Sequence, residues 1–499
     1  MNCIRFQVKK FNMATAALAM LALLFAGGVS PLQAQTYTPV YDFGFSDPNQ
    51  ANPIGQLALG RDGNFYGTMG LNYSQIYQIT PAGVETLLWS APAGSAYETE
   101  CTTGLTLGSD GLFYGTCKTY GGNNWASGGS GIVFKFDPSH GAGGFTILYS
   151  FPECNSNGSL YPSALTLGTD GNLYGATMGN SFCPNPYGTI FKVTPTGTFT
   201  TLHVFKGNGT GDGASPMGPL TLGADGNFYG TTQEGGTSAY TAGTVFKITP
   251  KGKIKLVHSF DNSVGYYPEA GVTQGADGKL YGTTASGGTY GGGSIFQVTI
   301  AGKIVFLHSF NYAVDDVSGP VNPLSLGADG SLYGPANCYS WGCGAESLYR
   351  ITTKGAYADL YNGFTDPEGA CPDWSVTGCY LSSPMALDPS GIFYGTAMQG
   401  GDYQDQPVGR GVFYSFNTGL KPYIILQFPR GTVGKSIGIF GQGFTKATAV
   451  AFNGKSATFN VLSDTYMTAT IPTTATKGYV TVTTPSGTLK SNIKLTVVK

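Results

Sequence analysis

One short motif recurs seven times along this chain of 499 residues. In each copy, phenylalanine or leucine is followed by tyrosine and glycine, close to a turn that contains glycine. Successive copies are 48 to 61 residues apart. A period of roughly 50 residues with several short strands per copy is typical of β-propeller blades rather than of helical solenoids. The seven tyrosines are Tyr66, Tyr114, Tyr174, Tyr229, Tyr281, Tyr333 and Tyr394.

The fourth copy shows what one repeat contains. Four runs of strand-forming residues are separated by turn signals, and they cover residues 220–223, 228–232, 243–249 and 255–260. Asp225 and Gly226 predict a tight hairpin because both residue types tolerate positive φ. Four strands in each of seven copies predict an all-β chain, with a seven-bladed β-propeller over residues 36–420.

The start of this region supplies a strand that belongs to no copy. Residues 37–43 (YTPVYDF) resemble the last strand of the fourth copy, residues 256–260 (LVHSF). The seventh copy ends near Phe416 without such a strand. We therefore expect Val40–Phe43 to complete the seventh blade and close the ring, which removes exposed sheet edges.

The repeat resembles the GloVer tandem-repeat family of exported bacterial proteins. The resemblance rests on DGNFYGT at 225–231 and GTVFKITP at 243–250, and it covers most of residues 37–418. It implies architecture and export, since no established activity comes with the family. Two copies depart from the pattern: Pro335 replaces the expected threonine, and the sequence 388–391 (DPSG) is expected to lengthen its turn.

Residues 1–34 look like a secretory signal. Three basic residues precede an apolar run over 13–25, and cleavage is expected after Ala34. The alternative is a membrane anchor, but a run of about 13 residues is shorter than the roughly 20 that span a bilayer. We expect a secreted or cell-surface protein with no transmembrane span after cleavage.

Charge separates residues 421–499 from the rest of the chain. They contain nine lysines and arginines with Asp464 as the only acidic residue, whereas residues 36–420 contain 27 acidic and 14 basic residues. This basic region can contact anionic envelope polymers or the acidic propeller. A solvated basic surface without a partner is the alternative. Export argues against a nucleic-acid partner.

Short strand patterns with intervening turns also mark residues 421–499 as a second domain. They include GIFGQGF at 438–444, VAFNG at 450–454 and YVTVTT at 479–484. This pattern resembles an IPT/TIG domain, and the resemblance implies an immunoglobulin-like sandwich.

Eight cysteines follow the signal, and an even number in an exported chain suggests disulfides. Two pairs flank hairpins of their own copies, at a spacing that fits two paired strands. Two further pairs would close local loops. The pairs are Cys101 with Cys117, Cys154 with Cys183, Cys338 with Cys343, and Cys371 with Cys379. No Cys-x-x-Cys pair with nearby histidines exists, so we predict no metal site and no cofactor.

Long loops before the first strand and after the second strand of each copy should gather on one face, opposite a plain face of short turns. Binding residues tend to lie on such loops, and the channel mouth is the default pocket. Aromatic rings there can stack on sugars or peptide side chains, or alternatively cap the core between blades. The candidates are Trp125, Trp341, Trp374, Tyr120, Tyr187, Tyr240, Tyr290 and Tyr403.

No catalytic group stands out from the sequence. Three histidines, His203, His258 and His308, occupy one last-strand position that tyrosine or tryptophan fills in other copies, which indicates packing. The favoured interpretation is a non-catalytic surface binding or scaffold protein for a glycan or a protein. One alternative is a polysaccharide lyase or hydrolase that uses loop carboxylates; the other is a structural adhesion component. The candidate carboxylates are Glu234, Asp373 and Asp402.

Overall fold

The computed structural model describes residues 35–43, 52–70, 74–91, 101, 103–118, 131–152, 161–179, 185–207, 210–237, 242–261, 265–311, 319–336, 346–362, 379–381, 383–399 and 411–499. Within these residues no helix is long and apolar enough to cross a membrane.

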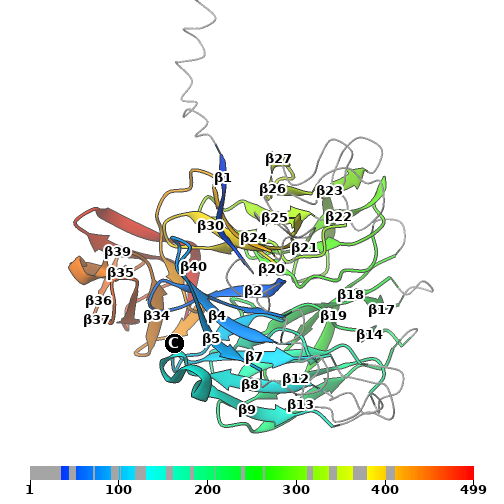
Figure 1. Cartoon of the computed structure of the whole chain (residues 1–499). Helices are drawn as coiled ribbons and strands as arrows, with labels where there is room; N and C mark the ends of the chain where they lie inside the picture. Colours follow the sequence, from blue (N-terminus) through cyan, green and yellow to red (C-terminus); the bar gives the residue numbers. More distant parts are fainter. Residues whose placement is uncertain are drawn as a thin grey trace, which may run out of the picture.

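Seven antiparallel sheets, here called blades 1 to 7, follow one another along the chain (Figure 1). In blades 1 to 6 each strand pairs with the next by hairpins. Blade 1 is β2 (Pro53–Leu59), β3 (Phe65–Met69), β4 (Gln75–Ile79) and β5 (Glu85–Ser90); blade 2 is β6 (Leu105–Leu107), β7 (Phe113–Cys117), β8 (Ile132–Phe136) and β9 (Phe145–Ser150); blade 3 is β10 (Thr166–Leu167), β11 (Leu173–Thr177), β12 (Thr189–Val193) and β13 (Phe199–Val204). Blade 4 is β15 (Thr221–Leu222), β16 (Phe228–Thr232), β18 (Thr244–Ile248) and β19 (Ile254–Ser259); blade 5 is β20 (Thr273–Gln274), β21 (Leu280–Thr284), β22 (Gly291–Val298) and β23 (Ile304–Asn311); blade 6 is β24 (Ser325–Leu326), β25 (Leu332–Ala336), β26 (Ser347–Ile351) and β27 (Tyr357–Tyr361).

Blade 7 combines the two ends of the repeat region. It contains β28 (Cys379–Leu381), β29 (Ala386–Leu387), β30 (Ile392–Gln399) and β31 (Val412–Asn417), and β1 (Thr36–Asp42) pairs antiparallel with β31. Tyr37 of β1 stacks on Tyr361 of blade 6 with ring centroids 4.5 Å apart. The expected N-terminal strand is therefore confirmed, and it begins four residues earlier than predicted.

The glycine of each recurring motif is explained by the neighbouring strand. Gly230 of β16 lies opposite Phe246 of β18. A Cβ atom on Gly230 would lie 2.6 Å from the ring of Phe246 and 2.9 Å from Leu220. The aromatic ring of the third strand thus lies over the glycine, and only a residue without a side chain leaves room for it.

The tyrosine of the motif is tied to the preceding turn in blades 1 to 6. Its hydroxyl donates to the turn aspartate over 2.6 to 3.2 Å, as Tyr229 does to Asp225. Burial raises the pKa of Tyr229, and the adjacent carboxylate raises it further. The tyrosine hydroxyl therefore stays protonated and continues to hold the turn.

The turn of blade 7 keeps the length of the others, so the expected longer turn is wrong. Asp388 N donates to Ile392 O over 3.0 Å, just as Gly223 N donates to Asn227 O over 2.8 Å in blade 4. Asp388 thus occupies the position of a glycine, and Ser390 replaces the usual aspartate. Blade 7 differs from the other blades in composition and not in register.

One predicted disulfide is present: Cys101 is bonded to Cys117 at the end of β7. Cys379 lies in β28, but its side chain is outside the described residues. The remaining candidates also lie outside them: Cys154, Cys183, Cys338, Cys343 and Cys371.

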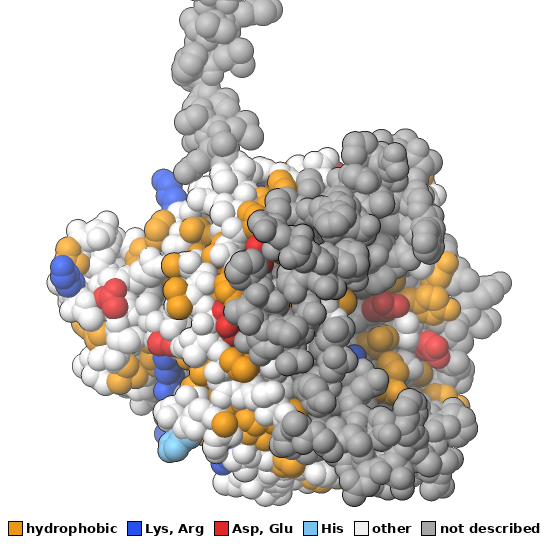
Figure 2. All heavy atoms as spheres, viewed as in Figure 1, with side chains coloured by type: hydrophobic (Ala, Val, Ile, Leu, Met, Phe, Trp, Pro, Cys, Tyr) orange, Lys and Arg blue, Asp and Glu red, His pale blue; other side chains and the backbone are white. Residues whose placement is uncertain are grey.

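The C-terminal residues form two sheets around a core of their own, called here the C-terminal sandwich. One sheet is β32 (Ile425–Leu426), β34 (Ser436–Phe440), β38 (Tyr466–Thr470) and β37 (Phe459–Val461); the other is β33 (Arg430–Thr432), β40 (Gly487–Val498), β39 (Gly478–Thr484), β35 (Ala449–Phe452) and β36 (Lys455–Ala457). Charged side chains are sparse among the described residues on the face seen in Figure 2, in keeping with a charged fraction of 11% for the chain.

Candidate functional site: the central channel and its cover

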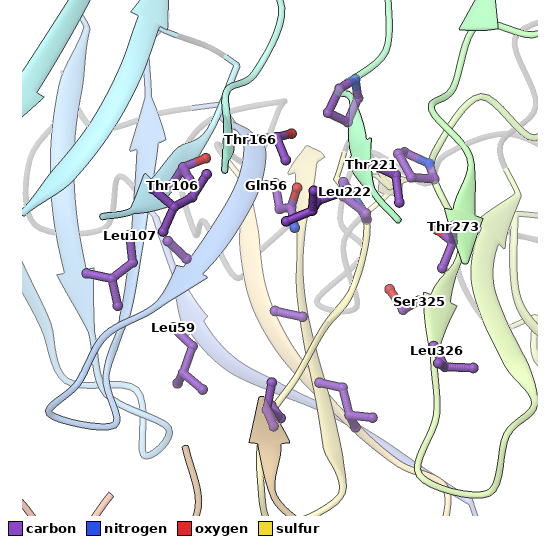
Figure 3. A pocket seen from close by; sticks show the side chains of 18 of the residues that line it. Gln56, Leu59, Thr106, Leu107, Thr166, Thr221, Leu222, Thr273, Ser325 and Leu326 are labelled. Carbon is purple, nitrogen blue, oxygen red and sulfur yellow. The ribbon is translucent and has the colours of Figure 1, made fainter. Parts of the chain in front are cut away.

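The first strands of all seven blades line one cavity of about 570 Å³ (Figure 3). The blades are therefore arranged around a central channel. Blade 1 closes against blade 7 through a shared core that includes Phe65, Tyr77, Tyr394 and Phe413. The channel wall is made of these short first strands.

A series of hydroxyl side chains, called here the hydroxyl ring, connects successive blades from blade 2 to blade 7 along this wall. Thr106 Oγ1 donates to Leu165 O over 2.6 Å, and Thr166 Oγ1 donates to Leu220 O over 2.5 Å. Equivalent bonds join blades 4 to 5, 5 to 6 and 6 to 7. Each hydroxyl gives its only hydrogen to the next blade, so its oxygen can act only as an acceptor toward the channel. The ring consists of Thr106, Thr166, Thr221, Thr273 and Ser325.

A second ring, the leucine collar, lies one residue further along the first strands. Apolar residues of the C-terminal sandwich, among them Ile425, Leu426 and Phe440, line the same cavity. This end of the channel therefore has a floor that belongs to the sandwich and is mostly apolar, with Gln427 and Asn492 as its polar residues. The collar consists of Leu59, Leu107, Leu167, Leu222, Leu326 and Leu387.

Arg61, in the short turn of blade 1, makes the central contact between sandwich and blades. Its carbonyl oxygen accepts hydrogen bonds from Ser463 Oγ at 2.8 Å and Thr465 Oγ1 at 2.7 Å. Its guanidinium donates to Ser109 O over 2.7 Å and lies 4.7 Å from the ring centroid of Tyr466. The short-turn face is therefore not a plain surface, because the sandwich covers part of it.

The unusual turn of blade 7 provides a second contact. Tyr423 N donates to Pro389 O over 2.9 Å, at the point where the chain enters the sandwich. Asp388 is only 4% exposed. Burial raises the pKa of this carboxyl, although hydrogen bonds from Ser390 and Ile392 oppose the shift. The turn whose residues differ from those of the other blades is therefore also the turn to which the C-terminal sandwich is attached.

The channel offers little for acid-base chemistry. Among its described lining residues none is Asp, Glu, Lys, Arg or His, and the strongly polar ones are Gln56, Gln427 and Asn492. In the described part of the chain no three His, Cys, Asp or Glu side chains gather as a metal site would require. The lining suits an uncharged group that donates hydrogen bonds to the hydroxyl ring.

Two of the predicted aromatic candidates are described, and they do not belong to neighbouring blades. The ring of Tyr187 is 41% exposed and lies over Gly207, between blades 3 and 4. Tyr290 is 56% exposed, and its N–H donates to Ser309 Oγ in blade 5. The other candidates lie outside the described residues: Trp125, Trp341, Trp374, Tyr120, Tyr240 and Tyr403.

Of the three candidate carboxylates only Glu234 is described. It lies in β17 (Glu234–Gly235), which pairs with β14 (Gly213–Ala214) between blades 3 and 4. Asp373 and Asp402 lie outside the described residues. Sequence reasoning missed Glu269, which precedes the first strand of blade 5. Burial raises the pKa of Glu269, and its Oε1 accepts from Gln233 Nε2 over 3.0 Å.

The shared histidine position is confirmed as a packing position. His203, His258 and His308 each meet a phenylalanine two residues later, edge to face, with centroids 4.8 to 5.1 Å apart. His203 Nε2 also lies 3.1 Å from Asp212 Oδ2. Burial acts to raise the pKa of Asp212, but the hydrogen bonds from His203 and the Gly213 N–H lower it.

The hydroxyl ring and the leucine collar were also missed, although the sequence contained a signal. Leu-Thr-Leu-Gly recurs at 105–108, 165–168 and 220–223, and in each copy its first leucine lies nine residues before the motif tyrosine. A threonine that repeats between two leucines in a strand marks one face of that strand. Which carbonyl it meets depends on a residue more than 50 positions away, as in the pair Thr221 and Val272.

The sheets and their common channel define an all-β protein with propeller-like blades. The chain belongs to the Gloeobacter/Verrucomicrobia repeat family, whose model matches residues 103–276 and 238–438. No curated protein matches this sequence.

Three solved structures are similar at low sequence identity. A putative gluconolactonase is 11% identical with a TM-score of 0.37, over 78% of this chain and 94% of that one. A protein of unknown function from Bacteroides thetaiotaomicron is 12% identical with a TM-score of 0.39, over 77% and 76%. A luciferin-regenerating enzyme is 12% identical with a TM-score of 0.38, over 78% and 98%. Identities this low say nothing about the activity of the present chain.

Proposed function

We propose that this chain is an exported binding or scaffold protein of the bacterial surface. Its blades would form a closed seven-bladed β-propeller, and residues 421–499 an immunoglobulin-like IPT/TIG domain. A glycan or a protein would bind on the long-loop face of the ring, at the mouth of the channel. Secretion or display at the cell surface is part of this proposal.

The observation that carries the proposal is the cover over one end of the channel. The sandwich provides a mostly apolar floor on the short-turn side, so a ligand would approach from the long-loop side. The described channel lining contains no charged side chain, which favours binding over acid-base catalysis. The signal-like residues 1–34 and the disulfide between Cys101 and Cys117 support export, since disulfides persist in oxidising compartments.

The test is binding of the mature protein, residues 35–499, to an array of bacterial and plant polysaccharides. Trp125→Ala, Trp341→Ala and Trp374→Ala are compared with the unchanged protein. Trp89→Phe serves as the matched control, because Trp89 is buried and stacks on Phe145 with centroids 4.2 Å apart. We expect a loop tryptophan variant to lose about tenfold or more in affinity, as removal of an aromatic anchor does.

Two outcomes would contradict the proposal. Intact protein that binds no polysaccharide and no surface protein of its own cells would favour a purely structural component. Turnover of a bound polysaccharide that disappears in Glu269→Gln or Glu234→Gln would favour the lyase or hydrolase.

A further inference from the structure

The C-terminal sandwich carries an excess of positive charge that its own acidic residue does not neutralise. Asp464 is the single acidic side chain among nine lysines and arginines in residues 421–499. Its carboxylate accepts hydrogen bonds from Thr445 Oγ1, Thr445 N and Gly443 N. These bonds lower the pKa of Asp464 and hold its charge beside the Phe444–Lys446 turn.

Two of the lysines converge on one aromatic ring. Lys490 Nζ lies 3.8 Å from the ring centroid of Tyr479, and Lys494 Nζ lies 5.5 Å from the same centroid. Both lysines are exposed. An ammonium is attracted to the face of a tyrosine ring, and neither strand partner of these lysines is acidic.

Strand pairing places the remaining side chains of this surface beside the lysines. Tyr479 pairs with Lys494, Thr481 with Lys490, and Thr483 with Thr488. The alternate residues of β39, Val480 and Val482, are buried in the sandwich core. The outward face of β39 and β40 therefore presents one ring, two ammonium groups and three hydroxyls, and none of its residues is acidic. We call Tyr479, Thr481, Thr483, Thr488, Lys490 and Lys494 the lysine face.

We propose that the lysine face binds an acidic polysaccharide. The two ammonium groups would pair with carboxylate or sulfate groups of the polymer, and the threonine hydroxyls would bond to its sugar hydroxyls. In Figure 1, β39 lies on the side of the sandwich away from the blades. Lys490 and Lys494 of β40 are exposed, so such a polymer can reach them while the sandwich covers the channel. This inference goes beyond the proposed function, because it concerns another domain and another ligand.

The experiment measures binding of the mature chain, residues 35–499, to polygalacturonate, to dextran and to polyglutamate by affinity electrophoresis. The double variant Lys490→Ser/Lys494→Ser removes the converging pair. The control Lys446→Ser/Lys455→Ser removes the same charge from exposed positions elsewhere in the sandwich. Melting temperatures identify any variant that is misfolded.

We expect polygalacturonate to bind and dextran not to bind. The Lys490/Lys494 variant should lose about tenfold in affinity, and the control about twofold, since exposed ion pairs contribute little singly. Added salt at about 0.5 M should weaken the binding because these charges are exposed. Equal losses in the two double variants, equal affinity for polyglutamate, or no binding of polygalacturonate would each overturn the proposal.

Discussion

Asp225 shows how one carboxylate stabilises a blade. It accepts hydrogen bonds from Lys247 Nζ at 2.7 Å, Tyr229 Oη at 2.8 Å and Asn227 Nδ2 at 2.8 Å. Burial acts to raise the pKa of Asp225, but the bonds from Lys247, Asn227 and Tyr229 lower it to about 2. An aspartate in an unfolded chain has a pKa of about 3.9. The carboxylate therefore favours the folded state above about pH 4, and this contribution is lost as the pH falls toward 2.

Asp225→Asn should accordingly lower the melting temperature by roughly 1 to 3 °C at pH 6. The difference in melting temperature between this variant and the unchanged protein should shrink as the pH falls from about 5 to 2. Thermal unfolding followed by circular dichroism across this range gives the measurement. The melting temperature of Lys247→Met should likewise approach that of the unchanged protein as the pH falls, because this substitution removes a hydrogen bond that lowers the pKa of Asp225. A difference in melting temperature that stays constant with pH would contradict a stabilising role of the ionised Asp225 carboxylate.

The motif glycine gives a second prediction about a single residue. Gly230→Ala places a methyl group 2.6 Å from the ring of Phe246, and this overpacking should destabilise the protein by about 1 to 3 kcal/mol. The control is Gly143→Ala, where a Cβ has no atom within 4 Å, and the expected change is within about 0.5 kcal/mol. Denaturant unfolding measures both. Equal effects of the two substitutions would show that the ring does not require the glycine.

Among the strands, β1 is expected to contribute most to thermal stability, because it joins the two ends of the ring. It pairs with β31 from Thr36 to Asp42, and Phe43 behind it is buried between blades 1 and 7. Deletion of residues 36–44 exposes the edge of β31 and removes Phe43 from this core. We expect the melting temperature to fall by roughly 5 to 10 °C in one cooperative step. An unchanged melting temperature would mean that β1 does not close the ring.

The elements were predictable because their signals are local. Four strands, an Asp-Gly turn and a glycine beneath a neighbouring ring all occur within one copy, so the fourth copy already contains most of its blade. The disulfide between Cys101 and Cys117 also lies within one hairpin. The turn of blade 7 was misread because Asp388 replaces a glycine and resembles the start of a longer turn. Counting back from the motif tyrosine gives the same turn length in blades 4 and 7, and the hydrogen bonds of Asp388 with Ile392 and Gly391 confirm this register.

The site was less predictable because it depends on contacts between distant parts of the chain. Thr106 meets the carbonyl of Leu165 in the next blade, and no local pattern specifies that partner. Arg61 is one of several different residues that precede Asp-Gly in the copies, and only its contact with Tyr466 shows its role. The loop aromatics were selected by position alone, and most of them lie outside the described residues.

At the scale of the whole molecule, the two domains meet through hydrogen bonds and apolar contact. The expected attraction of a basic domain to an acidic propeller does not account for Arg61, which is a cation on the blades and lies over Tyr466 of the sandwich. The leucine collar and Ile425, Leu426 and Phe440 of the sandwich line the same cavity. The sandwich therefore shields apolar surface that the blades alone would expose.

Removal of residues 421–499 should expose this surface. Contiguous apolar surface binds the dye anilinonaphthalene sulfonate, so residues 35–420 should enhance its fluorescence by about threefold or more over residues 35–499. Near-ultraviolet circular dichroism must show that the blades stay packed, since a loosened core would also bind dye. Leu107→Thr/Leu222→Thr in the shorter chain should then reduce the signal, because these two residues belong to the collar. Equal dye binding by the two chains, with the blades packed in both, would mean that the sandwich does not cover the channel in solution.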